Sequence, residues 1–548
     1  MLLISPSISY YSRYIRHDAP VMLFAVLWIW VIFKYLDDGK DHWLYASAAF
    51  FSLMHASKEV NYIYVAIVGG LLFFPFAWQV MTTKWWRADL FSVFTVALIA
   101  ALLLGAVFVF SFMGAQVEQQ DLDEAGNTRV ANVSLPWWGR VAAALAFASL
   151  FGALALVYYG IGEEAMHQIR LFDVLMAMGT LTLPLGSAFL IKFVAGIDMG
   201  VVYDVVRTGD FTTLPVSTVV GLFSVVGATL LGSVMLGVWW DKRRWPILAL
   251  IHYAIFFVTY TTIFTWGFGA LSGLVGSLAY WLAQQGVARG SQPWYYYGFI
   301  GPLYEYLPIL ISIPAGVGSV VCALKHRDQE SRIKNQESSV EHQDAYSLLP
   351  TPYSLFLTPF FPLFLLGWTL LSWLAYTYAG EKMPWLLVHI ALPSIFLAAW
   401  GLDRLVDALA LKDFLTGRKE GVRDLVAFAV ALPLTVTALA AFGRAVNALA
   451  RAMAPGIASA GPTLAQLEPF GNVLGSLLGC LIFGGVLFWA FDRVGTGRSL
   501  RLSALAFTLF LGLLTVRTAV MFNFINYDMA SEYLVYAHAA PDLCILYT

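Results

Sequence analysis

The chain has 548 residues, of which 59% are hydrophobic and only 12% charged, and its formal net charge is −2. Soluble proteins carry roughly 25% charged residues, so this composition excludes an ordinary soluble protein. No basic block is long enough to indicate a nucleic-acid partner. The three cysteines, Cys322, Cys480 and Cys544, lack metal-ligand spacing, and we interpret them as packing residues.

Apolar runs of about 20 residues recur along the whole chain, as in an all-α, polytopic bundle of transmembrane helices. The runs are continuous and lack the alternation of a membrane β-barrel. They predict about fourteen spans, at Ala19–Leu36, Trp43–Ala56, Val60–Met81, Ala88–Phe112, Gly139–Gly160, Leu171–Ala195, Leu214–Trp239, Pro246–Phe268, Gly301–Leu324, Pro352–Tyr378, Pro384–Arg404, Leu425–Ala450, Gly471–Phe491 and Leu502–Phe522.

The distribution of lysine and arginine predicts the orientation. Roughly 20 of the 32 Lys and Arg residues fall on one side, which makes that side the cytoplasm of a multi-pass plasma-membrane protein. The polar stretch 325–350 reads as a flexible cytoplasmic linker. It separates an N-terminal membrane module (1–324) from C-terminal membrane helices (351–522), and residues 523–548 form an external tail.

The opening stretch (residues 5–18) places Arg13, Arg16, His17 and Asp18 immediately before an apolar run. Charges beside a membrane span are costly unless they pair or sit at its mouth. Arginine suits a phosphate, and Asp18 can hold a divalent cation or take a proton. The alternative is a structural ion pair at a helix end with snorkelling arginines. Residues 1–9 also read as the last turns of a helix whose beginning is absent.

Two further groups of charges lie on the same external side. Lys58 and Glu59 stand between two apolar runs and could bind a sugar or phosphate, or satisfy each other. Glu381 and Lys382 precede a proline-initiated helix, with His389 one to two turns deeper. Lys382 is a candidate partner for a lipid phosphate, and the alternative is a capped helix turn.

An aromatic block precedes a buried-facing carboxylate on the same side. It includes Tyr296 and Tyr297, and Glu305 follows about one turn inside the next span. Aromatic faces can stack on sugar rings, although each ring alone could be an interface anchor. Because all these groups fall on one face, we expect them to share a cavity there. No nucleotide-binding, zinc-protease or hydrolase motif competes.

These segments resemble membrane proteins of archaea and bacteria described as flippase activity-associated, of the Agl type. The resemblance spans the chain, and Gly-Glu-Lys-Met-Pro-Trp is its most specific motif. It is carried by residues 5–18, 57–59, 292–297, 303–305, 380–386 and 526–536.

That family is similar to the GT-C glycosyltransferases related to protein O-mannosyltransferases and aminoarabinose transferases. The resemblance implies a GT-C-like fold that takes a sugar from a polyprenyl-phosphate donor at the external membrane face. It implies a catalytic aspartate, usually in an Asp-Glu pair, in a first external loop that would precede Met1. We therefore expect this chain to lack that loop and the first span, with Asp18 near the donor phosphate or a metal ion.

Three functional hypotheses remain open. The first is an inverting transferase in which an external carboxylate acts as base and Arg or Lys stabilises the departing lipid phosphate. The second is a non-catalytic partner in lipid-linked sugar flipping or export, which needs the same cavity. The third is an ion-coupled transporter, which predicts ionisable residues at mid-span.

Overall fold

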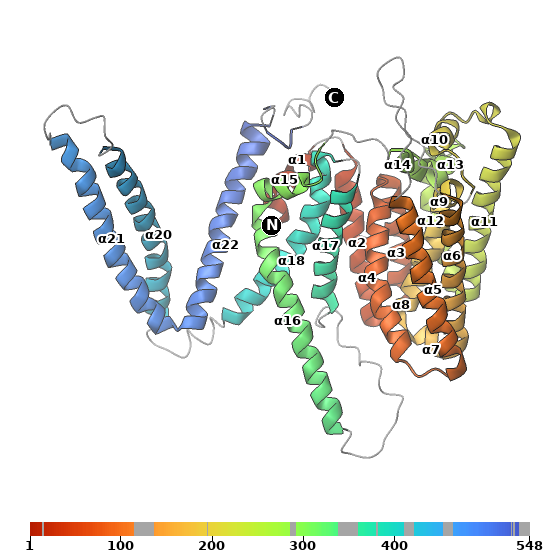
Figure 1. The fold of residues 1–548 in the computed structure, drawn as a ribbon, viewed down its shortest axis with the longest axis horizontal. Coiled ribbons are helices and arrows are strands. Elements are labelled where there is room, and N and C mark those ends of the chain that lie inside the picture. Colours follow the sequence, from red (N-terminus) through yellow and green to blue (C-terminus); the bar gives the residue numbers. More distant parts are fainter. Residues whose placement is uncertain are drawn as a thin grey trace.

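A computed structural model describes residues 1–13, 16–113, 136–193, 195–284, 292–337, 360–379, 382–409, 421–452, 464–527, 529 and 532–535. Every regular element in this part of the chain is helical, which confirms the all-α prediction (Figure 1). Eleven of the described helices are long and apolar enough to cross a membrane, or twelve if one bent pair counts as a span. The protein is therefore a multi-pass helical bundle with fewer full-length spans than the fourteen expected.

The first half of the chain forms η1 (Leu2–Ile4), α1 (Pro6–Ser12), α2 (Asp18–Asp38), α3 (Asp41–Ser57), α4 (Asn61–Thr82), α5 (Ala88–Met113), α6 (Trp137–Ile161), α7 (Glu163–Gln168), α8 (Arg170–Leu185), α9 (Ser187–Phe193), α10 (Met199–Thr208), η2 (Phe211–Thr213), α11 (Val216–Trp240) and α12 (Arg244–Tyr260). The second half forms α13 (Gly269–Leu271), the π-helical turn η3 (Ser272–Gly276), α14 (Ser277–Gln284), α15 (Tyr296–Tyr304), α16 (Tyr306–Glu337), α17 (Phe360–Tyr378), η5 (Pro384–Leu386), α18 (Leu387–Leu409), α20 (Gly421–Ala452), α21 (Leu464–Val494), α22 (Thr496–Val520) and the π-helical turn η6 (Met521–Ile525).

Three expected spans are shorter or broken, which explains the lower count. Helices α3 and α12 have 17 residues each, and a span needs about 20. The run expected to cross at Leu171–Ala195 is instead two helices, α8 and α9, that meet at 55° after Pro184. Helix α12 ends at Tyr260, before the expected Phe268, because the next turn is left-handed, with φ of 50°, 55° and 63° at residues 262–264.

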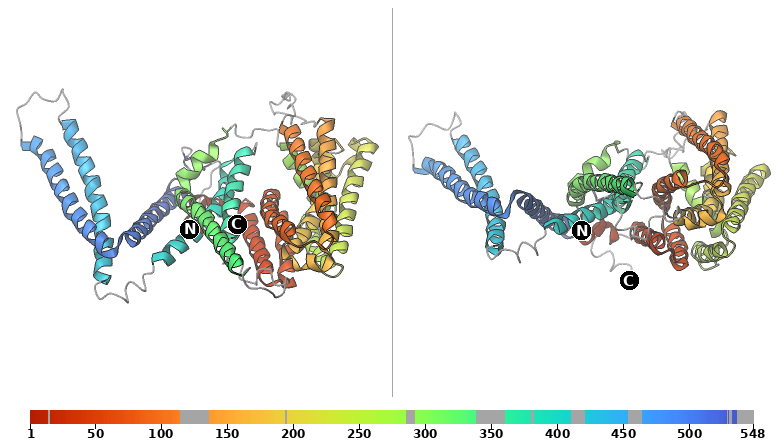
Figure 2. Two further views of the ribbon diagram at one scale, coloured as in Figure 1. Left: turned by 60° about the horizontal axis from the view of Figure 1, so that its bottom comes forward. Right: turned by 90° about the horizontal axis from the view of Figure 1, so that it is seen from below.

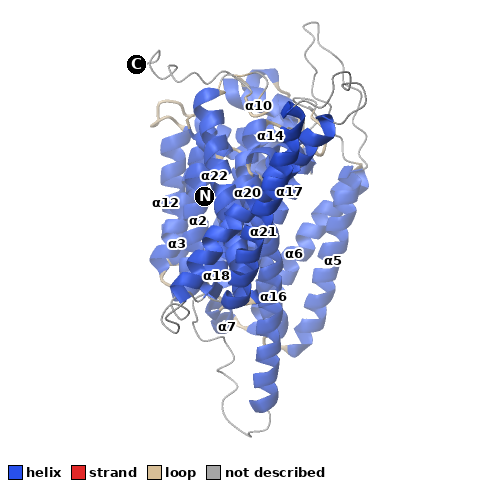
Figure 3. Cartoon of the chain, turned by 90° about the vertical axis from the view of Figure 1, so that its left-hand side faces the viewer, coloured by secondary structure: helices blue, strands red, loops and turns tan. Residues whose placement is uncertain are grey.

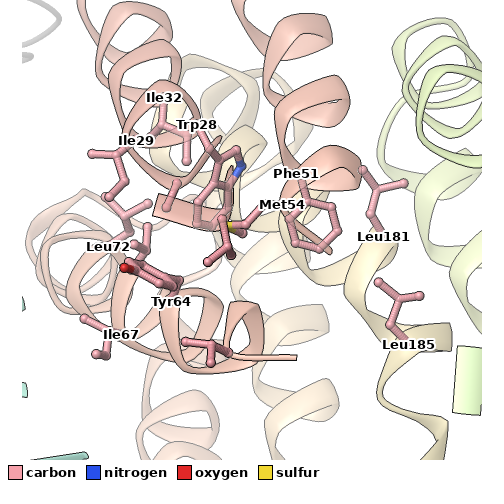
Figure 4. Close-up of a cluster of buried hydrophobic side chains, with 14 of the residues drawn as sticks. Trp28, Ile29, Ile32, Phe51, Met54, Tyr64, Ile67, Leu72, Leu181 and Leu185 are labelled. Atoms are coloured by element: carbon pink, nitrogen blue, oxygen red, sulfur yellow. The ribbon is translucent and has the colours of Figure 1, made fainter. Parts of the chain in front are cut away.

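The largest buried cluster joins α2, α3, α4 and α8 (Figure 4). Trp28 of α2, Met54 of α3, Leu72 of α4 and Leu185 of α8 are each at most 1% exposed. Interior faces of these helices are therefore packed against protein, whereas α5 and α21 expose large apolar side chains along most of their length. Apolar exposure of that extent suits lipid as the surrounding solvent.

Short helices α1 and α15 lie at one end of the bundle, which we call the α1 end (Figure 1). Helix α7 and the C-terminal part of α16 lie at the other end (Figures 1 and 3). Helices α20 and α21 form a hairpin that contacts α22 and stands away from α2–α17 (Figures 1 and 2). Helix α16 continues to Glu337, so the stretch expected to be a linker begins inside a helix, and the rest of that stretch lies outside the described residues.

At the end opposite α1, a buried carboxylate fastens four helices together. Asp173 of α8 accepts hydrogen bonds from Tyr35 of α2, from Trp240 Nε1 of α11 at 2.9 Å and from Arg244 of α12 at 3.0 Å. Arg244 also pairs with Asp41 of α3 at 3.1 Å. Because each charge has a partner, this network serves the packing of the bundle.

Candidate functional site: a buried aspartate at the α1 end

The sequence itself sets where the first two helices begin. Ser5 caps α1 by accepting a hydrogen bond from the Ile8 amide at 3.3 Å, and Pro6 occupies the first helical position, where proline costs no hydrogen bond. Helix α1 therefore begins at Pro6, whereas we expected residues 1–9 to end an earlier helix. Asp18 opens α2, where a negative charge is favoured by the helix dipole.

Asp18 is completely buried and joins residues from three helices and two loops. Its Oδ1 accepts from Lys58 Nζ at 2.5 Å and from His389 Nε2 at 3.0 Å, and its Oδ2 accepts from Arg16 Nε at 3.3 Å. His389 Nδ1 accepts from the Tyr64 hydroxyl at 2.9 Å, so a neutral imidazole with the proton on Nε2 satisfies both contacts. We call Arg16, Asp18, Lys58, Tyr64 and His389 the Asp18 cluster.

The two cations of the Asp18 cluster outnumber its carboxylate and reach solvent. The side chains of Arg16 and Lys58 are 25% and 16% exposed, whereas Asp18 is 0% exposed. Arg16 also lies over the ring of Trp385, 3.5 Å from its centroid. Burial lowers the pKa of the Lys58 ammonium, although Asp18 acts in the opposite direction. The cluster thus presents fixed positive charge to an anion.

Aromatic groups with unused donors extend the cluster inward. The Tyr376 ring stacks on His389 with centroids 5.6 Å apart and planes at 12°. Trp368 packs against Tyr64 at 6.2 Å. The Tyr376 hydroxyl and the Trp368 Nε1 are buried and have no hydrogen-bond partner within the described residues. Such donors suit a hydroxylated ligand, and sequence inspection missed them because tyrosines and tryptophans are common in apolar runs.

Glu305 lies at the same end of the bundle but in a separate environment. It is fully buried, and its Oε1 accepts from Ser5 Oγ at 2.6 Å, Ser7 Oγ at 2.6 Å and the Ser7 amide at 2.9 Å. Its Oε2 has no partner among the described atoms. Burial raises the pKa of the Glu305 carboxyl, and the serine donors oppose that shift. Glu305 therefore ties α16 to the opening stretch.

The C-terminal residues that follow η6 contact the same region. The Tyr304 hydroxyl donates to Glu532 at 2.6 Å, and Asn526 donates to the other carboxylate oxygen at 3.0 Å. The Tyr11 hydroxyl donates to the Leu534 carbonyl at 2.5 Å. These contacts hold the described tail residues over α1 and α15.

Arg13 contacts η6, the turn that follows α22, and forms no ion pair with Asp18 among the described residues. Its guanidinium donates to the Asn523 carbonyl at 2.6 Å and to the Asn523 side chain at 3.1 Å. Beside it is a cavity of about 610 Å³ between α2, α18 and α22. The walls are mainly apolar, with Met22 and Phe396 among them, and Ser9 and Ser12 lie with Arg13 at its polar edge.

The other candidates from the sequence lie near this region without joining the Asp18 cluster. Lys382 is 9% exposed and donates to the Ala379 carbonyl at 2.9 Å. The buried Tyr297 hydroxyl bonds both the carbonyl and the amide of Met383, and Tyr296 is buried beside it. Glu381 lies outside the described residues.

Lys58 and Glu59 do not pair with each other. Lys58 binds Asp18, and Glu59 is partly exposed, with no hydrogen bond or salt bridge to its carboxylate inside the described ranges. Glu59 lies within electrostatic range of Lys58, Tyr62 and Tyr260. Lys58 is therefore held by Asp18, and Glu59 acts on it only at longer range.

The described residues do not fit a divalent cation at Asp18. Both carboxylate oxygens already face Lys58, Arg16 or His389, and no group of three or more His, Cys, Asp or Glu ligands occurs in the described part of the chain. A metal would have to displace a cation that is held at 2.5 Å. We therefore assign no step to a metal ion.

Comparison with known proteins identifies no relative. No family model, no curated protein and no solved structure matches this chain. The function must therefore be argued from the site itself.

Proposed function

We propose that the chain handles polyprenyl-phosphate-linked sugars at the external face of the plasma membrane, as a GT-C-like glycosyltransferase. The observation that supports this proposal is the pair of cations, Arg16 and Lys58, that a buried Asp18 holds at one surface of a membrane bundle. Arginine and lysine are the residues that bind phosphate, and a fixed pair loses little entropy on binding.

The surroundings of the pair suit the rest of such a molecule. Arg13 borders the apolar cavity of about 610 Å³, which offers room for part of an isoprenoid chain. Tyr376 and Trp368 supply unused donors beside the cluster, and Trp385 supplies an aromatic face. Donors and aromatic rings together are typical of a saccharide site.

In the proposed reaction, the bond between the anomeric carbon and the phosphate oxygen breaks as the acceptor oxygen bonds to that carbon. The departing lipid phosphate keeps the electron pair and takes up the proton that the acceptor hydroxyl releases, and Arg16 and Lys58 stabilise its charge. Asp18 does not act as base, because three donors occupy its oxygens. It is a positioning residue, and none of the described carboxylates is assigned as the base.

The alternative is a non-catalytic partner in lipid-linked sugar flipping or export. It uses the same phosphate contact without bond cleavage. The two are distinguished by incubating the full chain in liposomes with a polyprenyl-phosphate donor that carries a radiolabelled sugar and following label in acceptor and in lipid. Label that reaches the acceptor supports the transferase, and label that only changes leaflet supports the partner.

The phosphate contact itself is tested by binding a polyprenyl monophosphate to the full chain in micelles. Losing one charge-assisted hydrogen bond costs about 1.5–3 kcal/mol, so Arg16→Gln should weaken binding by about tenfold to a hundredfold. The matched control is Arg87→Gln, because Arg87 is an exposed arginine between α4 and α5 and pairs with Asp89. The proposal is wrong if neutral polyprenol binds as tightly as the phosphate, or if Arg16→Gln binds like the control.

A further inference from the structure

An apolar cavity lies inside the bundle, away from the Asp18 cluster. Its volume is about 240 Å³, and its walls come from α4, α5, α6, α8 and α11. These helices lie on the side of the bundle away from α20 and α21 (Figures 1 and 2). Four of them, α4, α5, α6 and α11, are long and apolar enough to cross a membrane, so the cavity lies at membrane depth.

The polar groups at this cavity already have partners. Among the described residues that line it, Thr180 is the only one with a polar side chain. Its hydroxyl donates to the Met176 carbonyl at 2.7 Å and accepts from Trp245 Nε1 at 3.2 Å. Pro184 cannot donate to the Thr180 carbonyl, and Ser233 Oγ does so instead at 2.7 Å. A buried water needs roughly two to four polar partners, so we expect the cavity to be dry and to suit an apolar ligand.

The cavity is long and narrow. Its lining follows α8 from Phe172 to Leu183, which are 11 residues and therefore about 16 Å apart along the helix axis. A volume of about 240 Å³ spread over that length suits one extended hydrocarbon chain better than a compact ring system. Apolar cavities bind apolar molecules readily, because an empty cavity costs stability in proportion to its volume.

Glycine at position 179 keeps part of this space open. Gly179 lies inside α8 and lines the cavity, and a Cβ there would meet no atom within 4 Å. Glycine within a helix costs stability relative to alanine. The chain therefore has a residue that weakens the helix at a place where a larger side chain would narrow the cavity.

The rim of the cavity is in contact with the bilayer along α6. Leu150 and Phe151 line the cavity and are exposed on the surface of the bundle, where their apolar side chains suit lipid. Val80 of α4 and Met176 of α8 belong to the same lining but are only 1% and 6% exposed. The lining thus leads from the lipid-facing surface to buried side chains.

The cavity lies in the half of the membrane away from the Asp18 cluster. Its α4 lining runs from Phe73 to Val80, whereas Tyr64 of the Asp18 cluster lies near the start of α4. Tyr64 and Val80 are 16 residues apart, which is about 24 Å along the helix. Phe172, which also lines the cavity, is next to Asp173 of the network at the end opposite α1. The lipid available there belongs to the leaflet opposite the Asp18 cluster.

We propose that this cavity binds one acyl chain of a phospholipid from the leaflet opposite the Asp18 cluster. The chain enters past the exposed side chains of α6 and packs against α4 and α8, where protein atoms are missing. The contacts are apolar throughout, so the site selects a hydrocarbon chain and not a headgroup. The site is separate from the phosphate contact at the Asp18 cluster and independent of the proposed function.

The test maps the contacts of the acyl chain by photo-crosslinking. The full chain is reconstituted in phosphatidylglycerol vesicles that contain a trace of phosphatidylglycerol with a diazirine in one acyl chain, and labelled residues are identified by mass spectrometry. We expect label on the buried Val80 and Met176 as well as on Leu102 of α5, which is exposed. Lipid that only surrounds the protein would label Leu102 and leave Val80 and Met176 unlabelled, a result that would overturn the proposal.

Two glycine variants test whether the label depends on the cavity. Gly179→Leu places a side chain in the cavity, so label on Val80 and Met176 should fall at least about tenfold, the equivalent of losing about two buried methylene groups. Label on Leu102 should stay unchanged. Gly227→Leu is the matched control, because Gly227 lies inside α11, has no atom within 4 Å of its Cβ position and is not among the described residues that line the cavity. Label on Val80 and Met176 that persists in Gly179→Leu would contradict the proposal.

An excess of polyprenyl monophosphate distinguishes the two sources of a hydrocarbon chain. It should leave the label on Val80 and Met176 in place, because a chain whose phosphate lies at the Asp18 cluster begins about 24 Å away. Loss of that label would show that the occupant is an isoprenoid, and the proposal would be wrong. This arm and the labelling of the unmodified chain decide the proposal even where Gly179→Leu fails to fold, and neither requires phosphate binding at the Asp18 cluster.

Discussion

Asp18→Asn is the perturbation that tests the Asp18 cluster most directly. The change keeps the size of the side chain but leaves Lys58 and Arg16 without their counter-ion. Removing one partner from a buried ion pair costs about 3–5 kcal/mol. Since the two cations are 16% and 25% exposed, solvent compensates part of the loss, and we expect the free energy of unfolding to fall by about 3 kcal/mol. Unfolding by SDS titration in mixed micelles measures this change.

A double-mutant cycle with Lys58→Met separates the ion pair from other effects. Contacting pairs show coupling of about 0.5–3 kcal/mol, and a 2.5 Å contact to a buried carboxylate should lie in the upper half of that range. Asp38→Asn is the matched control, because Asp38 lies at the opposite end of α2 and pairs with Lys40, which is 65% exposed. The control should cost less than about 1 kcal/mol. Coupling below about 0.5 kcal/mol between Asp18 and Lys58 would refute the cluster.

Three further predictions concern neighbouring groups. Burial raises the pKa of Glu305 above 4.5, so between the two pKa values the folded chain keeps a proton that the unfolded chain releases. The contribution of Glu305 to stability is therefore greatest below pH 4.5 and falls by about 1.4 kcal/mol per pH unit until the folded pKa is reached. Glu305→Gln should abolish this slope, which is measured by comparing unfolding midpoints at about pH 5 and about pH 8. Burial lowers the pKa of Lys58, so the binding of polyprenyl monophosphate should weaken as pH rises toward 10.5. Lys58→Arg should move that decline to higher pH, because arginine stays charged. A pH profile of binding that is unchanged in Lys58→Arg would exclude Lys58 from the contact. Trp385→Leu removes the ring under Arg16 and should weaken the same binding by about twofold to thirtyfold, and wild-type affinity would exclude a role for this stacking.

The helices and their order follow closely from the sequence, because long apolar runs allow few structures in lipid. The misjudged spans have local causes. Pro184 and the bend after it divide one run, and a left-handed turn at residues 262–264 ends another. The second run carries no charge and the first carries only Asp173 and Lys192, neither of them at the break, so composition alone did not place the ends of these helices.

The site was predicted in part. Asp18, Arg16, Lys58 and His389 were each recognised as costly charges or ionisable groups at one end of the bundle, and the structure brings them together. The partners of Glu305 could not be predicted, since Ser5 and Ser7 are small polar residues about 300 positions away. Arg13 was grouped with Asp18 because of its position in sequence, but its contacts are to Asn523.

Exchanging Lys58 and Glu59 tests whether these neighbours serve two surroundings or only each other. The double variant Lys58→Glu/Glu59→Lys keeps the composition and the net charge. If the residues satisfied each other, as the sequence allowed, the exchange would be nearly neutral. In the structure, α3 ends at Ser57, and its C-cap, Lys58, has an extended backbone and binds Asp18. The exchange would therefore put a second carboxylate beside Asp18 in place of its counter-ion. Two carboxylates that close cannot both ionise. We therefore expect a loss of stability at least as large as for Asp18→Asn and no measurable polyprenyl monophosphate binding, and wild-type values for both would show that the dipeptide is a self-contained pair.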